Sequence, residues 1–339
     1  MPPPTVTVVV PTLAAGDTLA DCLRSLENQT FANFDVIVVD NSGSGAVTHT
    51  PTQRMRVIAN HRNVGFGAAV NQGYCSSSAP YLATLNDDAV ASPHWLEALV
   101  RAAEARPSAG QRIGMFASEV RLAESGALDS AGMLIAADGS SKQRGHGESP
   151  ARFSLEHDAL FPSGSAAMYR RNMLEEIGLF DESYFLYCED TDLGLRARWA
   201  GWECAYVPGA VVEHQYSHSA GRASSLKAYL VERNRIFTVL KNFPLRMWAG
   251  ASIAAHLRYW WHAVWMLRGL GKAAEFRDQG NSAWKLPLYV ARAHLAAFAN
   301  FPRLWREHRR IRGSRRISIG EFRALLAQHS ISVRKVAEL

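Results

Sequence analysis

Residues 5–12 read TVTVVVPT, a short run of β-branched residues that ends at Pro11 and Thr12. Such a run predicts a strand buried on both faces. In residues 17–29 the apolar side chains then recur at the spacing of an amphipathic helix. A strand followed by a helix begins a βαβ unit, so this stretch predicts a parallel sheet covered by helices.

The same alternation continues along the first third of the chain. Further strands are expected at residues 34–40, 55–60 and 81–85, and further helices at residues 67–74 and 93–104. The predicted fold class is therefore α/β, with a mostly parallel central sheet flanked by helices.

The remaining residues suggest a second, helical part. Residues 138–160 are rich in Gly, Ser and charged residues, which predicts an insertion loop. The elements expected after it are helices at 171–177 and from 189, short strands at 202–207 and 210–214, and long helices at 224–242, 246–268, 283–299 and 301–311. We therefore expect a catalytic domain over residues 1–222 and a helical C-terminal region over residues 223–339.

Composition limits the class of protein. Of 339 residues, 47% are hydrophobic and 20% charged, which is typical of a globular chain with a sizeable core. The four Cys are scattered without a C-x-x-C pair, so a disulfide framework or thiolate zinc site is not expected, and a reducing cytosol is the natural compartment. The N-terminal residues lack the basic and apolar regions of a signal peptide.

Charge is distributed unevenly along the chain. Residues 241–339 hold 18 Lys and Arg against 5 Asp and Glu, whereas residues 1–240 hold the remaining 19 and 26. The net charge of +6 thus combines an acidic body with a basic tail, and it is no argument for nucleic-acid binding by the whole chain.

Polar residues follow the predicted strands where each one ends. They are Thr12, Asp40-Asn41, Asn60 and Asn86-Asp87-Asp88. Because ligands of parallel sheets bind beyond the carboxyl ends of the strands, we expect these side chains to gather at one edge.

The adjacent carboxylates Asp87 and Asp88 allow two interpretations. They repel each other unless a cation separates them, which favours Mg²⁺ or Mn²⁺ bound through oxygen. Alternatively, they form a turn that caps the helix expected at Pro93.

Two further clusters have the same ambiguity. A predicted helix begins with Glu189, Asp190 and Asp192. Acidic residues there interact favourably with the helix dipole, and Asp192 can pair with Arg196. Alternatively, a carboxylate beside the apolar residues 185–187 would suit a general base. His214 could be a satisfied polar residue or a nitrogen ligand, which Mn²⁺ tolerates.

Residues 60–67 read NHRNVGFG, which is either a plain turn or a close approach of backbone to a ligand. The spacing is not that of the dinucleotide fingerprint, and motifs of P-loop, zinc-protease and serine-hydrolase sites are absent from the sequence.

An ordered set of segments resembles inverting glycosyltransferases of family 2, which have the GT-A fold. Within that family the chain is similar to rhamnosyltransferase- and galactofuranosyltransferase-like bacterial members. The segments are VVVPT (8–12), CLRSLENQTF (22–31), VIVVDNSGSG (36–45), NVGFGAAVNQG (63–73), TLNDDAV (84–90), PSGSAAMYRR (162–171), IGLFDESYFLYCEDTDLGLRARWAGW (177–202) and YVPGAVVEHQYSHS (206–219). The resemblance covers about residues 5–240.

The resemblance implies roles for particular residues. The donor nucleotide would contact Pro11, Thr12, Asp40, Asn41, Asn63 and Asp87. Gly164, Ser165 and Glu189 would contact the acceptor, and Asp88 and His214 would hold Mg²⁺ or Mn²⁺.

Asp190 would be the catalytic base. It would take the proton of an acceptor hydroxyl as that hydroxyl attacks the anomeric carbon. The chain departs from many relatives at Asn86, where they carry Asp, and at Asp87, where this branch often has Pro. Which of Asp87 and Asp88 contacts the metal is therefore left open.

The expected function is transfer of a rhamnose- or galactofuranose-like sugar from a nucleoside-diphosphate donor to a glycan or lipid-linked acceptor in cell-envelope polysaccharide synthesis. The alternatives are a sugar nucleotidyltransferase, whose basic Gly-rich loop after the first strand is missing here, and a non-catalytic nucleotide-sugar-binding protein. Release of nucleoside diphosphate would separate them. We expect no nucleic-acid partner.

The tail suggests contact with a membrane. Six of nine Trp lie beyond residue 245, and residues 303–316 carry seven Arg against one Glu. Arg258 lies in the middle of the apolar residues 247–267, which disfavours a membrane span. The tail could lie on an anionic surface, or it could form a helical bundle packed on the catalytic domain. The expected location is the cytoplasm, peripheral to the cytoplasmic face of the inner membrane.

Overall fold

The computed structural model describes residues 3–14, 17–47, 54–105, 110–155, 157–215, 224–278 and 282–338. Its contacts divide the chain into two compact units. The first comprises Met1–Met133, Gln143–Phe185 and Gly201–Ser219, and the second comprises Leu134–Lys142, Leu186–Ala200 and Ala220–Leu339. The last change of unit lies close to the expected boundary at residue 222, but two earlier segments group with the helical unit. The roles expected for the two domains stay a prediction.

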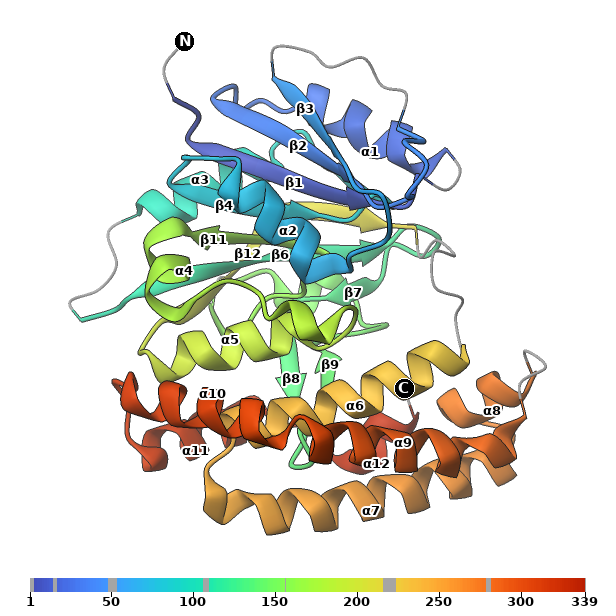
Figure 1. Ribbon diagram of the computed structural model, residues 1–339. Helices are drawn as coiled ribbons and strands as arrows, with labels where there is room; N and C mark the ends of the chain where they lie inside the picture. The colour runs from blue at the N-terminus through green and yellow to red at the C-terminus, as the bar shows by residue number, and fades with distance from the viewer. Residues whose placement is uncertain are drawn as a thin grey trace. The chain divides into compact units, whose positions relative to one another are not determined.

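The first unit is built on one large sheet (Figure 1). In spatial order its main path is β10 (His157–Ala159), β12 (Glu203–His214), β6 (Ile113–Leu122), β11 (Ala166–Arg170), β4 (Tyr81–Leu85), β1 (Val6–Thr12), β2 (Phe34–Asp40) and β3 (Met55–Ala59). Strands β4, β1, β2 and β3 are parallel, as are β6 and β12, while β11 runs antiparallel between β4 and β6. The short strands β5 (Ala89–Ala91) and β7 (Leu128–Ser130) pair with β12 and β6.

Helices cover both faces of this sheet because β1 is apolar on both. Val8 and Val10 belong to the core that includes α1 (Thr18–Glu27) and α3 (Trp95–Glu104). Val9 points the other way, where α2 (Phe66–Cys75) packs so closely that a Cβ on Gly73 would overlap the Val9 side chain. The expected class, a mostly parallel sheet flanked by helices, is confirmed.

The structure differs from the expectations in the second half of this unit. Strand β6 was not expected, because it contains the polar residues Ser118 and Glu119. Both are buried, and Glu119 accepts a hydrogen bond from Tyr206 at 2.8 Å. The two short strands expected at 202–207 and 210–214 form the one strand β12, whose register shifts between Val207 and Val211. Pro208 lies at that irregularity, where its missing N–H is tolerated.

The loop expected at residues 138–160 contains regular structure. It includes β9 (Ser141–Gln143), which pairs with β8 (Met133–Ile135), the 3-10 turn η1 (Pro150–Phe153) and β10. Helix α4 (Arg171–Ile177) agrees with the expected helix at 171–177. A second 3-10 turn, η2 (Glu182–Tyr184), precedes the change of unit after Phe185.

The second unit is helical. Its helices are α5 (Glu189–Trp199), α6 (Ser225–Asn242), α7 (Leu245–Leu267), α8 (Gly271–Asp278), α9 (Leu286–Ala299), α10 (Phe301–Gly313), α11 (Ile319–Gln328) and α12 (Val333–Glu338), with the 3-10 turn η3 (Ala283–Lys285) before α9. The four long helices expected after residue 224 correspond to α6, α7, α9 and α10; α8, α11 and α12 were not expected. Trp199 stacks on Phe322 with ring centroids 3.9 Å apart, which joins α5 to α11.

No helix in the described part of the chain combines the length and apolar character needed to cross a membrane. Arg258, in the middle of α7, is buried and pairs with Asp138 and Glu232 at 2.6 Å each. Removal of either carboxylate would leave the buried guanidinium without a full set of partners, so these ion pairs fix the position of α7 within this unit, which agrees with the expectation that residues 247–267 are no membrane span.

Candidate active site

The carboxyl ends of β1, β2 and β4 bring distant polar residues together. Thr12 donates a hydrogen bond to Asp87 at 2.6 Å, and the backbone N–H of Asn41 donates to the carbonyl of Thr12 at 2.7 Å. The amide of Asn60 donates to the side chain of Asn41 at 2.9 Å. These residues therefore gather at one edge of the sheet, as expected, and Pro11 lies beside them in β1, opposite Val39 of β2.

Asp40 organises the loop that follows β2. Its two carboxylate oxygens accept from the N–H groups of Ser42 at 2.8 Å and Val47 at 3.0 Å. Burial raises the pKa of Asp40, but these hydrogen bonds outweigh burial and lower its pKa overall. An ionised Asp40 at this edge can hold the loop and still present lone pairs to a ligand.

Asn63 begins the turn that enters α2. Its side-chain oxygen accepts from the N–H of Gly65 at 2.9 Å. Gly65 has φ of +88° and lies so close to the carbonyl of Phe185 that a Cβ there would overlap it. The turn therefore requires a glycine at position 65, and the hydrogen bond to Asn63 stabilises the turn.

Asp87 and Asp88 differ in their surroundings. Burial raises the pKa of Asp87, the hydrogen bond from Thr12 opposes this, and the neighbouring Asp88 raises the pKa further. Neither residue caps α3, because that helix has His94 at its N-cap without a side-chain hydrogen bond. The capping interpretation of the pair is therefore wrong.

His214 ends β12 beside Asp88. Its Nε2 lies 3.0 Å from Oδ1 of Asp88, and its Nδ1 lies 3.3 Å from Oδ2 of Asp129 in β7. Asp129 in turn lies 3.1 Å from Nδ1 of His146. These four side chains form a row of alternating carboxylate and imidazole in which both carboxylates are buried and His146 is partly exposed. Only Asp88 and His214 of this row were expected. Residues 216–219 of the motif that carries His214 lie outside the described residues.

The charges in this row stabilise one another. Burial lowers the pKa of His214, but hydrogen bonds and charges of Asp129 and Asp88 outweigh burial and raise its pKa to about 9. Burial raises the pKa of Asp129, yet the bonds with His146 and His214 bring its pKa to about 2. At neutral pH His214 is therefore protonated and carries the positive charge between the two carboxylates, and a metal ion that bound at Nε2 would displace the proton there.

A divalent cation fits this arrangement. Asp88 and His214 offer one oxygen and one nitrogen ligand, and Asp129 can hold the imidazole with its Nε2 lone pair towards the cation. Within the described ranges no group of three or more His, Cys, Asp or Glu residues could hold a metal ion. Two protein ligands suit Mg²⁺ or Mn²⁺, whose other positions water and substrate phosphates fill.

Hydrogen bonds hold Gly164 and Ser165 next to this edge of the sheet. The hydroxyl of Thr84 donates to the carbonyl of Gly164 at 2.9 Å, and the N–H of Asn86 donates to the carbonyl of Ser165 at 2.8 Å. The segment expected to contact the acceptor therefore starts β11 alongside the end of β4.

The second unit carries the acidic pair Glu189 and Asp190 at the start of α5. Oδ1 of Asp190 accepts from the N–H of Thr191 at 2.6 Å. Glu189 is 8% exposed, and its Oε2 is buried without a hydrogen-bond partner among the described residues. Burial is the larger cause, and repulsion from Asp190 the smaller one, of a rise in the pKa of Glu189 to about 8.

Asp192 has a different surrounding. It pairs with Arg196 and with Lys241 at 2.9 Å each, and all three side chains are buried. The expected Asp192–Arg196 pair is thus confirmed, and Asp192 is part of the packing of α5 on α6. The expected approach of Asp190 to Asp87 and Asp88, which belong to the other unit, stays a prediction.

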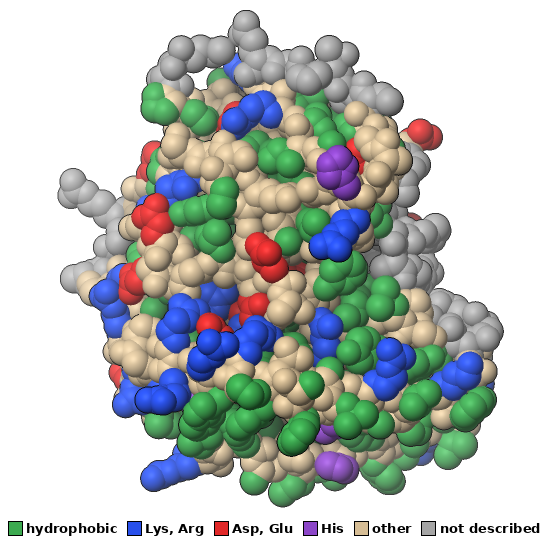
Figure 2. All heavy atoms as spheres, viewed as in Figure 1, with side chains coloured by type: hydrophobic (Ala, Val, Ile, Leu, Met, Phe, Trp, Pro, Cys, Tyr) green, Lys and Arg blue, Asp and Glu red, His purple; other side chains and the backbone are tan. Residues whose placement is uncertain are grey.

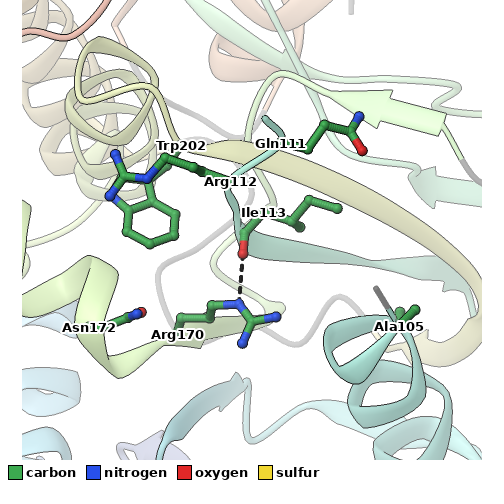
Figure 3. A pocket seen from close by; sticks show the side chains of 8 residues that line it. Ala105, Gln111, Arg112, Ile113, Arg170, Asn172 and Trp202 are labelled. Atoms are coloured by element: carbon green, nitrogen blue, oxygen red, sulfur yellow. Dashed lines mark hydrogen bonds between the residues drawn. The ribbon is translucent and has the colours of Figure 1, made fainter. Parts of the chain in front are cut away.

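A cavity of about 220 Å³ lies elsewhere in the first unit (Figure 3). Its cationic side chains are already engaged: Arg112 pairs with Glu176 at 2.6 Å, and Arg170 donates to the carbonyl of Ile113 at 2.7 Å. Ile113 is the first residue of β6, whereas Leu122, the last, is opposite His214. The cavity is therefore at the wrong end of the sheet for the site above.

Comparison with known proteins gives a consistent result. A family model described as "Glycosyltransferase like family 2" matches residues 2–237. The N-acetylglucosaminyl-diphospho-decaprenol L-rhamnosyltransferase of Mycobacterium tuberculosis (strain ATCC 25618 / H37Rv) is 30% identical over 250 residues, 66% of this chain and 80% of that protein. Rhamnosyltransferase WbbL of Escherichia coli (strain K12) is 39% identical over 67 residues, 20% of this chain and 25% of that protein.

Solved structures support the fold. The crystal structure of GalNAc-T7 with UDP, GalNAc and Mn²⁺ matches with a TM-score of 0.55 at 14% identity, over 86% of this chain and 57% of that chain. The match confirms the expected GT-A type of sheet and helices. The family model and the 30% identical relative show that this chain is a glycosyltransferase and belongs to family 2.

Proposed function

We propose that this glycosyltransferase moves an L-rhamnose- or galactofuranose-like sugar, with inversion, from a nucleoside-diphosphate donor to a glycan or lipid-linked acceptor. The observation that carries the proposal is the 30% identical rhamnosyltransferase, whose name specifies an N-acetylglucosaminyl-diphospho-decaprenol acceptor. A polyprenyl-diphosphate acceptor of the same chemistry is the first candidate, and the setting would be synthesis of cell-envelope polysaccharide.

The first unit would bind the donor. Its contacts would come from Pro11, Thr12, Asp40, Asn41, Asn63 and Asp87, which lie at or near the carboxyl ends of the parallel strands. Asp88 and His214 would hold Mg²⁺ or Mn²⁺, which neutralises the charge that grows on a diphosphate leaving group. Asp129 would hold His214 in the tautomer that leaves Nε2 unprotonated.

The second unit would supply the base. Asp190 would accept the proton of the acceptor hydroxyl as its oxygen bonds to the anomeric carbon. The bond from that carbon to the diphosphate oxygen breaks, and its electron pair leaves with the nucleoside diphosphate. Glu189, with a pKa of about 8, is mostly protonated at neutral pH, so it would donate a hydrogen bond to an acceptor oxygen. Gly164 and Ser165 of the first unit would also contact the acceptor.

We further propose that the second unit lies on an anionic membrane surface at the cytoplasmic face. Apolar side chains are exposed along α7 and α9, including Leu257, Trp260, Leu295 and Phe298. Figure 2 shows hydrophobic side chains over these helices with Lys and Arg beside them. Exposed Trp and basic residues together favour the headgroup region of anionic lipids.

Release of nucleoside diphosphate tests the reaction. A panel of dTDP-, UDP- and GDP-sugars is offered with Mn²⁺ and a polyprenyl-diphosphate-GlcNAc acceptor. We expect release that requires both acceptor and metal, and that stops with EDTA and returns with Mn²⁺. Donor binding with no release under any of these conditions would indicate a binding protein. Failure to sediment with anionic vesicles at low salt would refute the membrane contact alone.

A further inference from the structure

The segment that leads into the acidic pair has an unfavourable backbone. Tyr187 and Cys188 have φ of 70° and 65°, and Phe185, just before the change of unit, has φ of 64°. Among the described residues one other non-glycine residue, Ala14, has a positive φ. Side chains with a Cβ rarely adopt this conformation, so it persists only where surrounding structure holds it.

The helix itself holds the last residue of this segment, because the carbonyl of Cys188 accepts from the N–H of Asp192 at 3.0 Å, but it does not hold the two residues before it. Cys188 is the N-cap of α5, is left-handed, and makes no side-chain capping hydrogen bond. The carbonyls of Leu186 and Tyr187 precede the helix and cannot take part in its hydrogen bonds. Some other group must therefore hold the turn that presents Glu189 and Asp190.

Asn234 of α6 is that group. Its amide nitrogen donates to the carbonyls of Leu186 and Tyr187, at 2.7 Å each, so both hydrogens of one amide are used. Its oxygen accepts from Nε of Arg233 at 2.9 Å, which fixes the nitrogen side of the amide towards the turn. Asn234 is fully buried, so water does not compete for these bonds.

The part of α6 that carries Asn234 is rigidly attached. Glu232 accepts from Arg258 of α7 at 2.6 Å, and Arg235 donates to the carbonyl of Asp138 at 2.6 Å. Arg235 and Glu232 also bind each other, and both are buried. A residue fixed between two such anchors can impose a position on a neighbouring backbone.

We propose that Asn234 is a positioning residue that holds the strained turn at 186–188 so that Asp190 is presented to the acceptor hydroxyl. This inference rests on the proposed role of Asp190 as the base. Asn234 touches no reacting atom, and its removal would allow the turn to relax towards ordinary φ values. Asp190, which is three and four residues beyond the two carbonyls that Asn234 binds, would then be displaced while the donor site of the first unit stays intact.

The test uses the full chain with Asn234→Ala and the isosteric Asn234→Asp, which fills the same volume but places oxygen against the two carbonyls. Asn242→Ala is the matched control: Asn242 is on the same helix, is also fully buried, and donates to Asp192 at 2.9 Å instead of to the turn. Measurements are kcat, KM for donor, melting temperature, and amide hydrogen exchange of the peptide covering residues 186–191.

For both variants of Asn234 we expect kcat to fall on the order of 10- to 100-fold, because misplacement of a reacting group by about 1 Å has this effect. Donor KM should stay near that of the unaltered protein, and exchange at 186–191 should rise. Asn242→Ala should lower the melting temperature while kcat changes little. If Asn234→Ala does not fold, Asn234→Asp is judged by the same criteria.

Two results would overturn the inference: a folded Asn234 variant with unchanged kcat, or an equal loss of kcat in Asn242→Ala. Asp190→Asn, measured in parallel, separates this from failure of the proposed function. Normal turnover in Asp190→Asn would refute the role of Asp190 as the base. Loss of turnover in Asp190→Asn together with full turnover in the Asn234 variants would refute only the positioning role of Asn234.

Discussion

Replacing Asp129 with Asn should weaken binding of Mn²⁺ without removing any metal ligand. Asp129 is 3% exposed, and its carboxylate lies 3.3 Å from Nδ1 of His214, whose Nε2 faces Asp88. Once a cation has displaced the proton of Nε2, the carboxylate of Asp129 keeps the remaining ring proton on Nδ1 and holds Nε2 towards the cation. Asn keeps the size of the side chain but loses its charge, and it can also turn its NH₂ group towards Nδ1, which favours the wrong tautomer.

The size of the effect follows from the change in hydrogen bond. A bond to a charged partner contributes about 1.5–3 kcal/mol and a neutral one about 0.5–1.5 kcal/mol, so the exchange costs about 1–1.5 kcal/mol. A loss of about 1.4 kcal/mol is a tenfold loss of affinity. We therefore expect the Kd for Mn²⁺ to rise about tenfold, and up to about 100-fold where the tautomer is also lost.

The assay is titration of the full chain with Mn²⁺ in the presence of a nucleoside diphosphate, following free Mn²⁺ by its electron paramagnetic resonance signal. Asp35→Asn is the control, because Asp35 pairs with Arg56 at 2.9 Å near the start of β2, at the other end of the strand from Asp40. Unchanged Mn²⁺ affinity in Asp129→Asn, together with a clear loss in His214→Ala, would refute this reasoning. Unchanged affinity in His214→Ala would instead refute the metal site.

Three further changes test other parts of the site and fold. Asp190→Asn should keep donor binding but lose about 10²–10⁴ of turnover, the usual contribution of a general base, as measured by release of nucleoside diphosphate. The raised pKa of Glu189, about 8, means that folding favours its neutral form, so its ionisation lowers stability progressively as pH rises from its ordinary value of 4.5 to about 8. Glu189→Gln should therefore raise the melting temperature relative to the unaltered protein more at pH 8.5 than at pH 5, to the order of a few degrees; an equal effect at both pH values would contradict the burial argument. Gly73→Ala should destabilise the first unit by about 1–3 kcal/mol through overlap with Val9, whereas Gly250→Ala, with nothing within 4 Å of its Cβ position, should stabilise α7 by up to about 1 kcal/mol in chemical denaturation; equal effects of the two would show that α2 can move away from β1.

The parallel half of the sheet could be predicted from the sequence because its strands are buried on both faces. Residues 6–12 and 34–40 are apolar runs that end in Thr12 and Asp40, and residues 81–85 are one that is followed by Asn86, so both the strands and their polar edge follow from pattern alone. Strand β6 could not be predicted in this way, because Glu119 is an interior residue there and is satisfied by Tyr206 across the sheet. A buried carboxylate with a distant partner has the same sequence signature as an exposed one.

The sequence indicates candidate residues that would contact the metal or the substrates directly, and it does not indicate residues that bind to those candidates; the roles of the candidates stay predictions. Asp88 and His214 lie in motifs, but Asp129 and His146 lie in segments without any catalytic pattern. The pairing of β7 with β6 brings Asp129 to His214, and His146 contacts Asp129. Asn234 likewise reads as a helix residue of ordinary polarity. Its function depends on two backbone carbonyls about 47 residues earlier in the chain, which no local spacing reveals.

Asp129 and Glu189 are held in opposite protonation states by their surroundings. In the first unit, Asp129 has a pKa of about 2 because two imidazoles face it, so this row stays ionised and suits a cation. In the second unit, Glu189 has a pKa of about 8 because its buried Oε2 has no partner among the described residues and Asp190 lies beside it. A neutral Glu189 spares Asp190 the repulsion of a second charge, and Asp190 can then accept a proton from a hydroxyl. Separation of pKa values within a set of carboxylates is what assigns one to charge stabilisation and another to proton transfer. In the proposed mechanism Asp88 would hold the metal and Asp190 would accept the proton, and the two imidazoles beside Asp129 account for the difference in pKa between Asp129 and Glu189.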